Sequence, residues 1–241
     1  MRNGFANQHQ NQKYFYVFLL VGIVLALASV PLMNLVKADN LNPSLYSIDT
    51  SPYGISYQKW LERLWQWKFA VPTAENTVHT YSREKCAIGQ QGPVWFLNEL
   101  LSGTEDRTCT VPAGKSILLP VLDGQCDTSD VRLHTDQDLI QCASAGNEYG
   151  VISATVDGTP IKNLDSYRTH TEFYNITVPA DNIFKEKPPG TYRSYTDATA
   201  LFLSPLAPGS HEVHYTVAIS NPIQPNYNYA ADLTFHLIVK P

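Results

Sequence analysis

The sequence is poor in charge and has no cluster of basic residues. Only 16% of its 241 residues are Asp, Glu, Lys or Arg. Three of the 17 basic residues are Arg2, Lys13 and Lys37, and no acidic residue precedes Asp39, so residues 39–241 carry 14 basic and 22 acidic residues, a formal charge of −8. Nucleic-acid binding needs clustered Lys and Arg against the phosphates. The composition therefore argues against nucleic acid as a partner, and against docking on anionic lipid.

The sequence also lacks the short motifs of common enzyme classes. A G-x-S-x-G nucleophile elbow, an H-E-x-x-H zinc motif, a P-loop and a dinucleotide fingerprint are all absent. Two S-x-x-K strings, Ser56–Lys59 and Ser82–Lys85, occur without the S-D-N and K-T-G partners of a β-lactamase-type site, so we interpret them as chance. No catalytic residue is identified, and the sequence leans away from an enzyme.

One long apolar segment is present, from Tyr14 to Val36, and it carries no charge. A helix needs about 20 residues to cross a bilayer, and a secretory hydrophobic region is usually about 7–15 residues long. Length therefore favours an uncleaved anchor, whereas Val36 and Ala38 fit the small-residue positions of a cleavage site. Either way, residues 1–38 are expected to be a signal peptide or signal anchor, and residues 39–241 are expected to be exported.

Four cysteines lie in the segment expected to be exported: Cys86, Cys109, Cys126 and Cys142. An even number in an oxidising compartment predicts two disulfides. Three pairings are possible, and we favour the two that close local loops, Cys86–Cys109 and Cys126–Cys142. Each would stabilise the fold by roughly 3 kcal/mol, by restricting the unfolded chain. A zinc site is the alternative, but the sequence has no C-x-x-C pair.

Residues 55–69 have the pattern of an amphipathic soluble helix. Apolar side chains recur at i, i+4 and i+7, namely Trp60, Leu64 and Trp67. Ser56 is a candidate N-cap, and Pro72 prevents the helix from continuing. We expect the aromatic stripe to pack in the core, with a stacking platform for a sugar or a partner as the alternative.

From residue 94 onward the patterns are those of β-strands. The expected strands are Val94–Leu97, Thr108–Val111, Ser116–Leu122, Val151–Val156, Pro160–Leu164, Glu172–Val178, Thr199–Ser204, Glu212–Ile219 and Ala231–Val239. The last two alternate apolar and polar residues, as strands with one solvated face do. We predict a mainly β fold: an antiparallel β-sandwich, immunoglobulin-like or jelly-roll-like, with one amphipathic N-terminal helix.

The expected domain organisation is simple. Residues 39–54 are polar, contain two prolines and are interpreted as a linker or surface arm. Residues 55–241 form one extracytoplasmic β-rich domain, with a soft boundary near residues 143–150. Asp157-Gly158 is expected to form a tight two-residue hairpin, because both positions tolerate positive φ.

Carboxylates gather in the segment DGQCDTSDVRLHTDQD, which starts at Asp123. Asp123, Asp127 and Asp130 are candidate calcium ligands, because Ca²⁺ binds several hard oxygens. The spacing fits no EF-hand, and a solvated, disulfide-closed loop is the alternative. The same carboxylates are candidates for the acid/base pair of a glycoside hydrolase, which needs two carboxyl groups about 5–10 Å apart. No other cofactor is expected.

Two histidines on the last two predicted strands are a second metal candidate. His214 and His236 both lie on the polar faces of their strands. If the final hairpin is symmetric about Pro225, they lie opposite each other with Cβ atoms about 5 Å apart. The alternative is two exposed surface histidines.

Two polar-aromatic segments are candidate ligand contacts. In the first, Gln90, Gln91 and Trp95 combine amides with an aromatic face, which suits sugar hydroxyls and ring C–H edges. The alternative is a turn that enters a buried strand. In the second, Tyr227 and Tyr229 lie in the loop before the last strand, where a plain solvated loop is the alternative.

The segment Leu201–Val239, with its PLAPGSHEVHYTV turn-and-strand and its final DLTFHLIV strand, resembles the closing strands of immunoglobulin-like sandwiches in extracellular microbial proteins. A second resemblance covers most of residues 57–239. It rests on Trp65-Gln66-Trp67, CAIGQ from Cys86, GPVWFL from Gly92, CTVPAGK from Cys109, and Pro120, and it is to uncharacterised predicted secreted proteins of microbes. Neither resemblance implies an activity.

These observations predict an exported, disulfide-stabilised binding or interaction module, or an accessory surface subunit. Its expected partner is a protein or carbohydrate at the cell surface, together with the membrane if the N-terminal helix is uncleaved. Asn175, in Asn175-Ile176-Thr177, is the expected glycosylation acceptor and should be exposed. The alternative function is an extracellular carbohydrate-active hydrolase that uses Asp or Glu. Two buried carboxyl groups that converge in an aromatic-lined cleft would keep that alternative open.

Overall fold

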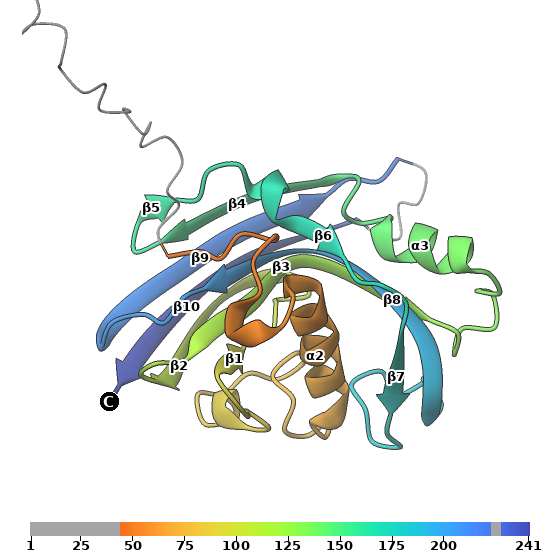
Figure 1. Ribbon diagram of the computed structural model, residues 1–241, viewed down its shortest axis with the longest axis horizontal. Helices are drawn as coiled ribbons and strands as arrows, with labels where there is room; N and C mark the ends of the chain where they lie inside the picture. Colours follow the sequence, from red (N-terminus) through yellow and green to blue (C-terminus); the bar gives the residue numbers. More distant parts are fainter. Residues whose placement is uncertain (1–43, 223–227) are drawn as a thin grey trace, which may run out of the picture. The chain divides into compact units, whose positions relative to one another are not determined.

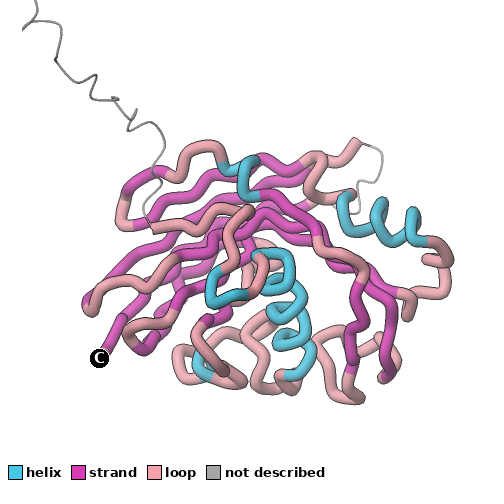
Figure 2. Tube along the Cα trace, viewed as in Figure 1, coloured by secondary structure: helices cyan, strands magenta, loops and turns pink. Residues whose placement is uncertain are grey.

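Residues 44–222 and 228–241 are described by the structure, a computed structural model, and most of them belong to two packed β-sheets (Figures 1 and 2). The predicted signal or anchor segment lies outside these residues. Among the helices of the described residues, none has the length and apolarity that crossing a bilayer requires. The mainly β sandwich that the sequence predicts is confirmed, whereas its strand directions differ from the prediction.

One sheet, here called the covered sheet, has a helix on its outer face. Its strands, in spatial order, are β1 (Val94–Phe96), β3 (Ser116–Asp127), β8 (Gly190–Leu203) and β6 (Arg168–His170), and β7 (Tyr174–Val178) also pairs with β8. The other sheet, here called the open sheet, consists of β2 (Gly103–Pro112), β10 (Tyr229–Lys240), β9 (Gly209–Ile219), β4 (Gly150–Val156) and β5 (Thr159–Pro160). The two sheets enclose the main apolar core, which includes Trp95, Leu119, Leu201, Tyr215 and Phe235.

Both sheets are mixed: most strand pairs are antiparallel, as the sequence predicts, but two are parallel. β1 pairs parallel with β3, and β2 pairs parallel with β10. The turn 113–115 joins β2 directly to β3, yet these two strands belong to different sheets. The chain therefore reverses by crossing between the sheets. Two such crossings, from β1 to β2 and from β2 to β3, return the chain to its first sheet in the original direction, so β1 and β3 run parallel.

The helix α2 (Tyr57–Ala70) forms where the sequence predicts it and lies on the covered sheet (Figure 1). Ser56 Oγ accepts a hydrogen bond from the Lys59 N–H at 3.2 Å and caps its first turn. Its apolar stripe packs on side chains of β1, β3 and β8 such as Phe96, Leu118 and Phe202. The covered sheet is thus buried on both faces, which explains the continuous apolar runs in β3 and β8.

The acidic segment contains a second helix, α3 (Asp136–Ser144), which the sequence analysis interprets as a loop. A capping box starts it: the Thr135 side chain accepts from the Asp138 N–H at 3.1 Å, and the Asp138 carboxylate accepts from the Thr135 N–H at 2.8 Å. The first part of the same segment, from Asp123 to Asp127, extends β3. The segment therefore consists of a strand end, a turn and a helix.

Two further local expectations are wrong. The strand expected over Pro160–Leu164 is reduced to β5, because Asn163 adopts a left-handed conformation (φ 55°) and Leu164 begins a 3₁₀ helix. In the final hairpin, His214 pairs with Thr234 and His236 pairs with Glu212, so the two histidines are not opposite each other. The predicted two-residue turn after β4 is confirmed, with φ of 49° at Asp157 and 73° at Gly158.

The described part of the expected linker, residues 44–54, lies against the covered sheet. The Tyr46 N–H donates to the Phe202 carbonyl at 2.8 Å, and Leu45 forms an isolated bridge with Leu203. Both sheets combine strands from before and after residues 143–150, so residues 44–222 and 228–241 form one structural unit.

Candidate functional site

A fully buried lysine lies at the centre of the candidate site. Lys68, in the last turns of α2, has 0% of its surface exposed. Its Nζ lies 2.7 Å from Glu99 Oε2 and 3.1 Å from Asp123 Oδ2, and 4.1 Å from the centre of the Trp65 ring. A buried ammonium requires compensation of this kind, because leaving water costs several kcal/mol per ion. We call Lys68, Glu99 and Asp123 the ionic triad.

Core side chains fix the loop that carries Glu99. Arg107 of β2 is almost fully buried, and its guanidinium donates to the Asn98 carbonyl at 3.0 Å and to the Glu99 carbonyl at 3.2 Å. The neighbouring Leu100 N–H donates to the Tyr215 hydroxyl at 2.9 Å. These bonds hold the carboxylate in place from the side of the core, so the triad is preorganised rather than a chance contact of surface side chains.

Burial and charge set the protonation of the triad. Burial, and then the Glu99 carboxylate, raise the pKa of Asp123 to about 6, although Lys68 acts in the opposite direction. Burial alone would lower the pKa of Lys68, but Asp123 and Glu99 outweigh it and raise that pKa. Lys68 is therefore charged at neutral pH. Asp123 changes protonation within the range in which general acids work.

Two members of the triad, Glu99 and Asp123, line a cavity of about 370 Å³, here called the triad cavity. Its aromatic wall consists of Trp65, Phe184 and Tyr229. Burial first, and then Asp123 and Glu99, raise the pKa of Tyr229, so its phenol stays protonated. Leu101 and Phe184, which are 45% and 37% exposed, also line it, and both are unusually exposed for large apolar residues. The cavity thus offers charge and aromatic surface together.

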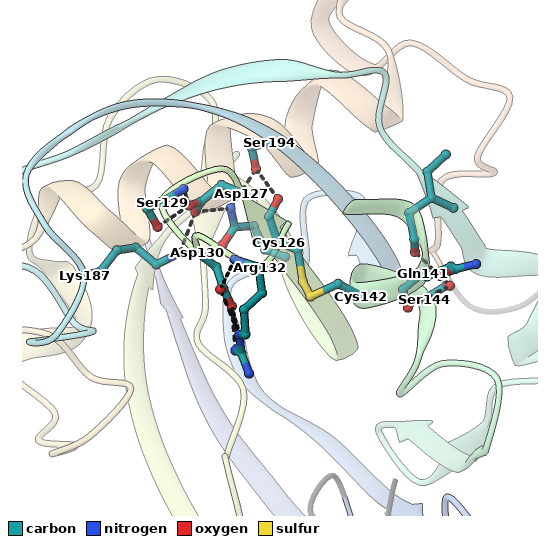
Figure 3. Close-up of a disulfide and its surroundings, with 12 residues drawn as sticks. Cys126, Asp127, Ser129, Asp130, Arg132, Gln141, Cys142, Ser144, Lys187 and Ser194 are labelled. Carbon is teal, nitrogen blue, oxygen red and sulfur yellow. Dashed lines mark hydrogen bonds and ion pairs between the residues drawn. A yellow bond between two sulfur atoms is a disulfide. The ribbon is translucent and has the colours of Figure 1, made fainter. Parts of the chain in front are cut away.

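The far wall of the cavity is held by a disulfide and a close backbone contact. The structure contains Cys126–Cys142, which joins β3 to α3 (Figure 3), and Cys86–Cys109; this is the pairing favoured from loop length. Gly124 allows α3 to approach β3, because a Cβ there would lie 2.1 Å from the Ala143 carbonyl oxygen. Within the described residues, the Oε1 of Gln125 in this wall accepts no hydrogen bond.

The three predicted calcium ligands are not brought together. Asp123 pairs with Lys68, whereas Asp127 pairs with Lys187 and also accepts from Ser129 and Gln125 (Figure 3). Asp130 forms its ion pair with Arg132. In residues 44–222 and 228–241, no group of three or more His, Cys, Asp or Glu side chains is arranged to hold a metal ion. These aspartates therefore form ion pairs with separate basic side chains.

The predicted ligand contacts have different positions. Trp95 lies in the core between the sheets, and the Gln90 amide is bonded to the backbone of Phe96, at 2.7 and 2.9 Å, so neither is available to a ligand. Gln91 lines a separate groove beside α2, and Tyr229 lines the triad cavity. Tyr227 is outside the described residues.

Lys68 and Glu99 are the site residues that the sequence analysis missed. A signal for Lys68 is present: it lies four residues after Leu64 and three after Trp65, on the apolar side of the helix, where a charged residue requires a buried partner. No comparable signal marks Glu99, because its loop is positioned by contacts that are distant in the sequence. The sequence predicts Asp123 as a metal ligand, but in the structure it is an ion-pair partner of Lys68.

Comparisons with known proteins assign no family. No protein-family model matches the chain, and no curated protein matches it. Among solved structures, the cysteine protease inhibitor EhICP2 from Entamoeba histolytica is similar over 61% of this chain and 96% of that chain, with a TM-score of 0.23 and 10% identity. A likeness at this TM-score carries no argument about function. The class that the fold itself defines is a mainly β sandwich with two disulfides.

Proposed function

We propose that this chain is an exported binding module that takes a small, hydroxyl-rich ligand of about monosaccharide size in the triad cavity. The observation that carries the proposal is the fully buried Lys68, held between two carboxylates that line an aromatic-walled cavity. Buried ion pairs add little net stability compared with apolar side chains of similar volume. Perturbed charged groups that line a cavity are therefore more typical of a binding or active site than of a structural core.

The cavity also suggests the ligand class. Its volume of about 370 Å³ is within the usual range of small-molecule sites, about 300–1,000 Å³. Trp65, Phe184 and Tyr229 offer ring surface to the C–H faces of a sugar. The carboxylates and Gln125 Oε1 accept hydrogen bonds from hydroxyl groups. Hydroxyl donors with apolar ring faces fit this combination.

The expected extracytoplasmic location of the protein supports the same proposal. The structure contains two disulfides, and disulfides persist in oxidising compartments but are rare in the reducing cytosol. An extracytoplasmic module, secreted or tethered by its N-terminal segment, meets carbohydrates and proteins at the cell surface. In this proposal the carbohydrate is the ligand of the triad cavity, and a protein partner would use another surface.

The test is calorimetric titration of the full-length protein with a panel of neutral monosaccharides. We expect at least one sugar to bind, with Glu99→Gln and Phe184→Ala each weakening affinity roughly tenfold, the size typical of a lost charged hydrogen bond or ring contact. Glu62→Gln is the matched control, because Glu62 pairs with the exposed Lys59 on the same helix. The proposal fails if no sugar binds, or if Glu99→Gln and Glu62→Gln bind equally well.

A second candidate function is glycoside hydrolysis, which one observation favours. Glu99 Oε2 and Asp123 Oδ2 lie 2.7 and 3.1 Å from the same Nζ and are therefore less than 5.8 Å apart. This bound excludes the separation of about 6.5–9.5 Å of an inverting pair and is compatible only with the separation of about 5–5.5 Å of a retaining pair. Asp123, with its pKa raised to about 6, would protonate the glycosidic oxygen while Glu99 attacks the anomeric carbon and forms a covalent glycosyl-enzyme. Asp123 would then remove a proton from the water that hydrolyses this intermediate and releases Glu99.

The two candidates are distinguished by turnover. Wild-type protein is incubated with oligosaccharides of the sugar that binds, and new reducing ends are measured. Hydrolysis predicts product from wild-type protein and none from Asp123→Asn, which retains the shape of the side chain. If a sugar binds but no reducing ends form, the hydrolase is rejected and the binding module is retained.

A further inference from the structure

We infer that a second face of α2 forms a binding site for an acidic saccharide unit, a sugar ring that carries a carboxylate. The site is the groove of about 600 Å³ between α2 and the segment 88–93, here called the Arg63 groove. Arg63 and Trp67 line it, four residues apart on one side of the helix, whereas Trp65 lines the triad cavity. The two sites therefore use different residues.

The aromatic wall of the groove is fixed in place. The Trp67 indole N–H donates to the Ile88 carbonyl at 3.2 Å, and its ring lies 5.6 Å from that of Phe96 at a tilt of 40°. Gly89, with φ of 70°, lets the loop backbone close on this ring, since a Cβ there would lie 2.9 Å from Val71 Cγ2 and 3.0 Å from Trp67 Nε1. A ring held in this way is a preorganised stacking surface for the C–H face of a sugar.

Arg63 is the charged residue that lines the groove, and it forms no ion pair with any residue that the structure describes. Its guanidinium lies 4.8 Å from the centre of the Trp60 ring. By contrast, Arg107, Arg132, Arg168 and Arg193 each pair with a carboxylate. In a segment with a formal charge of −8, an arginine without an ion-pair partner beside an aromatic groove is complementary to a carboxylate ligand.

Gln91 adds a free amide. It is exposed, it lines the groove, and its side chain has no hydrogen-bond partner in the described part of the chain. Gln66 also lines the groove, but its amide is already occupied: Nε2 donates to the Thr177 carbonyl and Oε1 accepts from the Thr177 N–H, both at 3.1 Å. Gln91 is therefore available to hydroxyl groups. An aromatic platform, an arginine and an amide together match a sugar ring with one carboxylate and several hydroxyls.

The test uses trigalacturonate as the acidic probe and a neutral galactose trisaccharide as its counterpart, titrated calorimetrically into the full-length protein. We expect trigalacturonate to bind at least tenfold more tightly than the neutral trisaccharide, and Arg63→Gln to weaken it roughly tenfold, as the loss of a charge-assisted bidentate contact does. Gln91→Ala should weaken it by a smaller factor. Arg83→Gln is the matched control, because it removes one exposed arginine that bonds to Thr110 elsewhere.

Three results would overturn the inference. The first is equal trigalacturonate affinity in Arg63→Gln and Arg83→Gln. The second is equal affinity of wild-type protein for the acidic and the neutral trisaccharide. The third is binding of benzoate as tight as that of trigalacturonate, which would make the groove a site for apolar carboxylates. Circular dichroism of each variant confirms that the fold is retained, and because Arg63 and Gln91 are exposed, their replacement should not unfold the protein.

Discussion

Lys68 Nζ on α2 lies 3.1 Å from Asp123 Oδ2 on β3, and both side chains are buried, at 0% and 3% exposure. The pair links the helix to the edge of the apolar core. Its surroundings distinguish it from a surface ion pair, because a third group, Glu99, shares the same ammonium and the two carboxylates line one cavity. The stability and pH dependence of the protein therefore report on this contact.

Removal of the ammonium should be strongly destabilising. Lys68→Met leaves two buried carboxylates facing each other, and the loss of one partner of a buried ion pair costs about 3–5 kcal/mol. We expect a loss of that size in urea unfolding at pH 7 and a smaller loss at pH 4.5, where Asp123, with its pKa of about 6, is protonated. Lys59→Met, on the exposed side of the same helix, should change the free energy of unfolding by less than about 0.5 kcal/mol. Equal effects of the two substitutions would contradict a buried triad.

Asp123 should make stability fall as pH rises through the mildly acidic range. Its pKa is about 6 in the folded protein and about 3.8 in the unfolded chain, so between these values the folded state binds the extra proton. The stability that its protonated form contributes is complete below pH 3.8 and is lost as pH rises to 6. Relative to wild type, Asp123→Asn should therefore gain stability between pH 4 and 6, measured by urea unfolding at each pH.

Asp130 is a control whose pKa is shifted in the opposite direction to that of Asp123. Hydrogen bonds from Arg132 lower its pKa to about 2, so the stability that it contributes is present above pH 3.8 and is lost as pH falls toward 2. The difference between wild type and Asp130→Asn should be constant from pH 4 to 7 and should shrink only below pH 4. If the stability difference between wild type and Asp123→Asn is also constant from pH 4 to 6, the pKa of Asp123 is not raised in the folded protein.

The two disulfides should differ in their effect on the candidate site. Replacement of either pair by serine should lower the free energy of unfolding by roughly 3 kcal/mol, because each closes a loop of about 15 to 25 residues. Only Cys126–Cys142 lines the triad cavity, and it joins β3 to α3. The Cys126→Ser/Cys142→Ser variant should therefore also bind sugar more weakly, whereas Cys86→Ser/Cys109→Ser should retain wild-type affinity while folded. Identical sugar affinities of the two variants would show that Cys126–Cys142 does not support the binding site.

Asn175 should be glycosylated when the protein passes through a secretory pathway that recognises N-x-T. It is exposed and lies on β7, which pairs with β8. Peptide mapping should find the glycan on the peptide that contains Asn175 and none in Asn175→Gln. The same map reports whether the N-terminus is Met1 or Asp39. An unmodified Asn175 together with four reduced thiols would contradict export.

Sequence patterns predict α2 and the final two strands because both depend on local periodicity. The 3.6-residue stripe of α2 and the alternation in β9 and β10 are visible without any tertiary information. α3 is missed although its capping box is local, since Thr135 and Asp138 are read as part of an acidic loop. The T-x-x-D pattern is the local signal that marks its start.

The errors of strand direction and register arise from contacts distant in the sequence. No local signal shows that β2 and β3 belong to different sheets. In the final hairpin each β9 residue pairs with the β10 residue two positions before the expected one, which separates His214 from His236. The triad joins a helix, a loop and a strand that are up to 55 residues apart, so only its carboxylate Asp123 was recognised from the sequence.

The most direct test of the central claim is an NMR titration of ¹⁵N-labelled protein with neutral monosaccharides, followed at the indole N–H of each tryptophan. Trp65 lies in the wall of the triad cavity, whereas Trp95 is buried between the sheets and serves as the internal control. We predict that the binding sugar shifts the Trp65 resonance in a saturable manner and leaves Trp95 unmoved. A panel in which no sugar shifts Trp65 more than Trp95 would contradict a ligand site at the ionic triad.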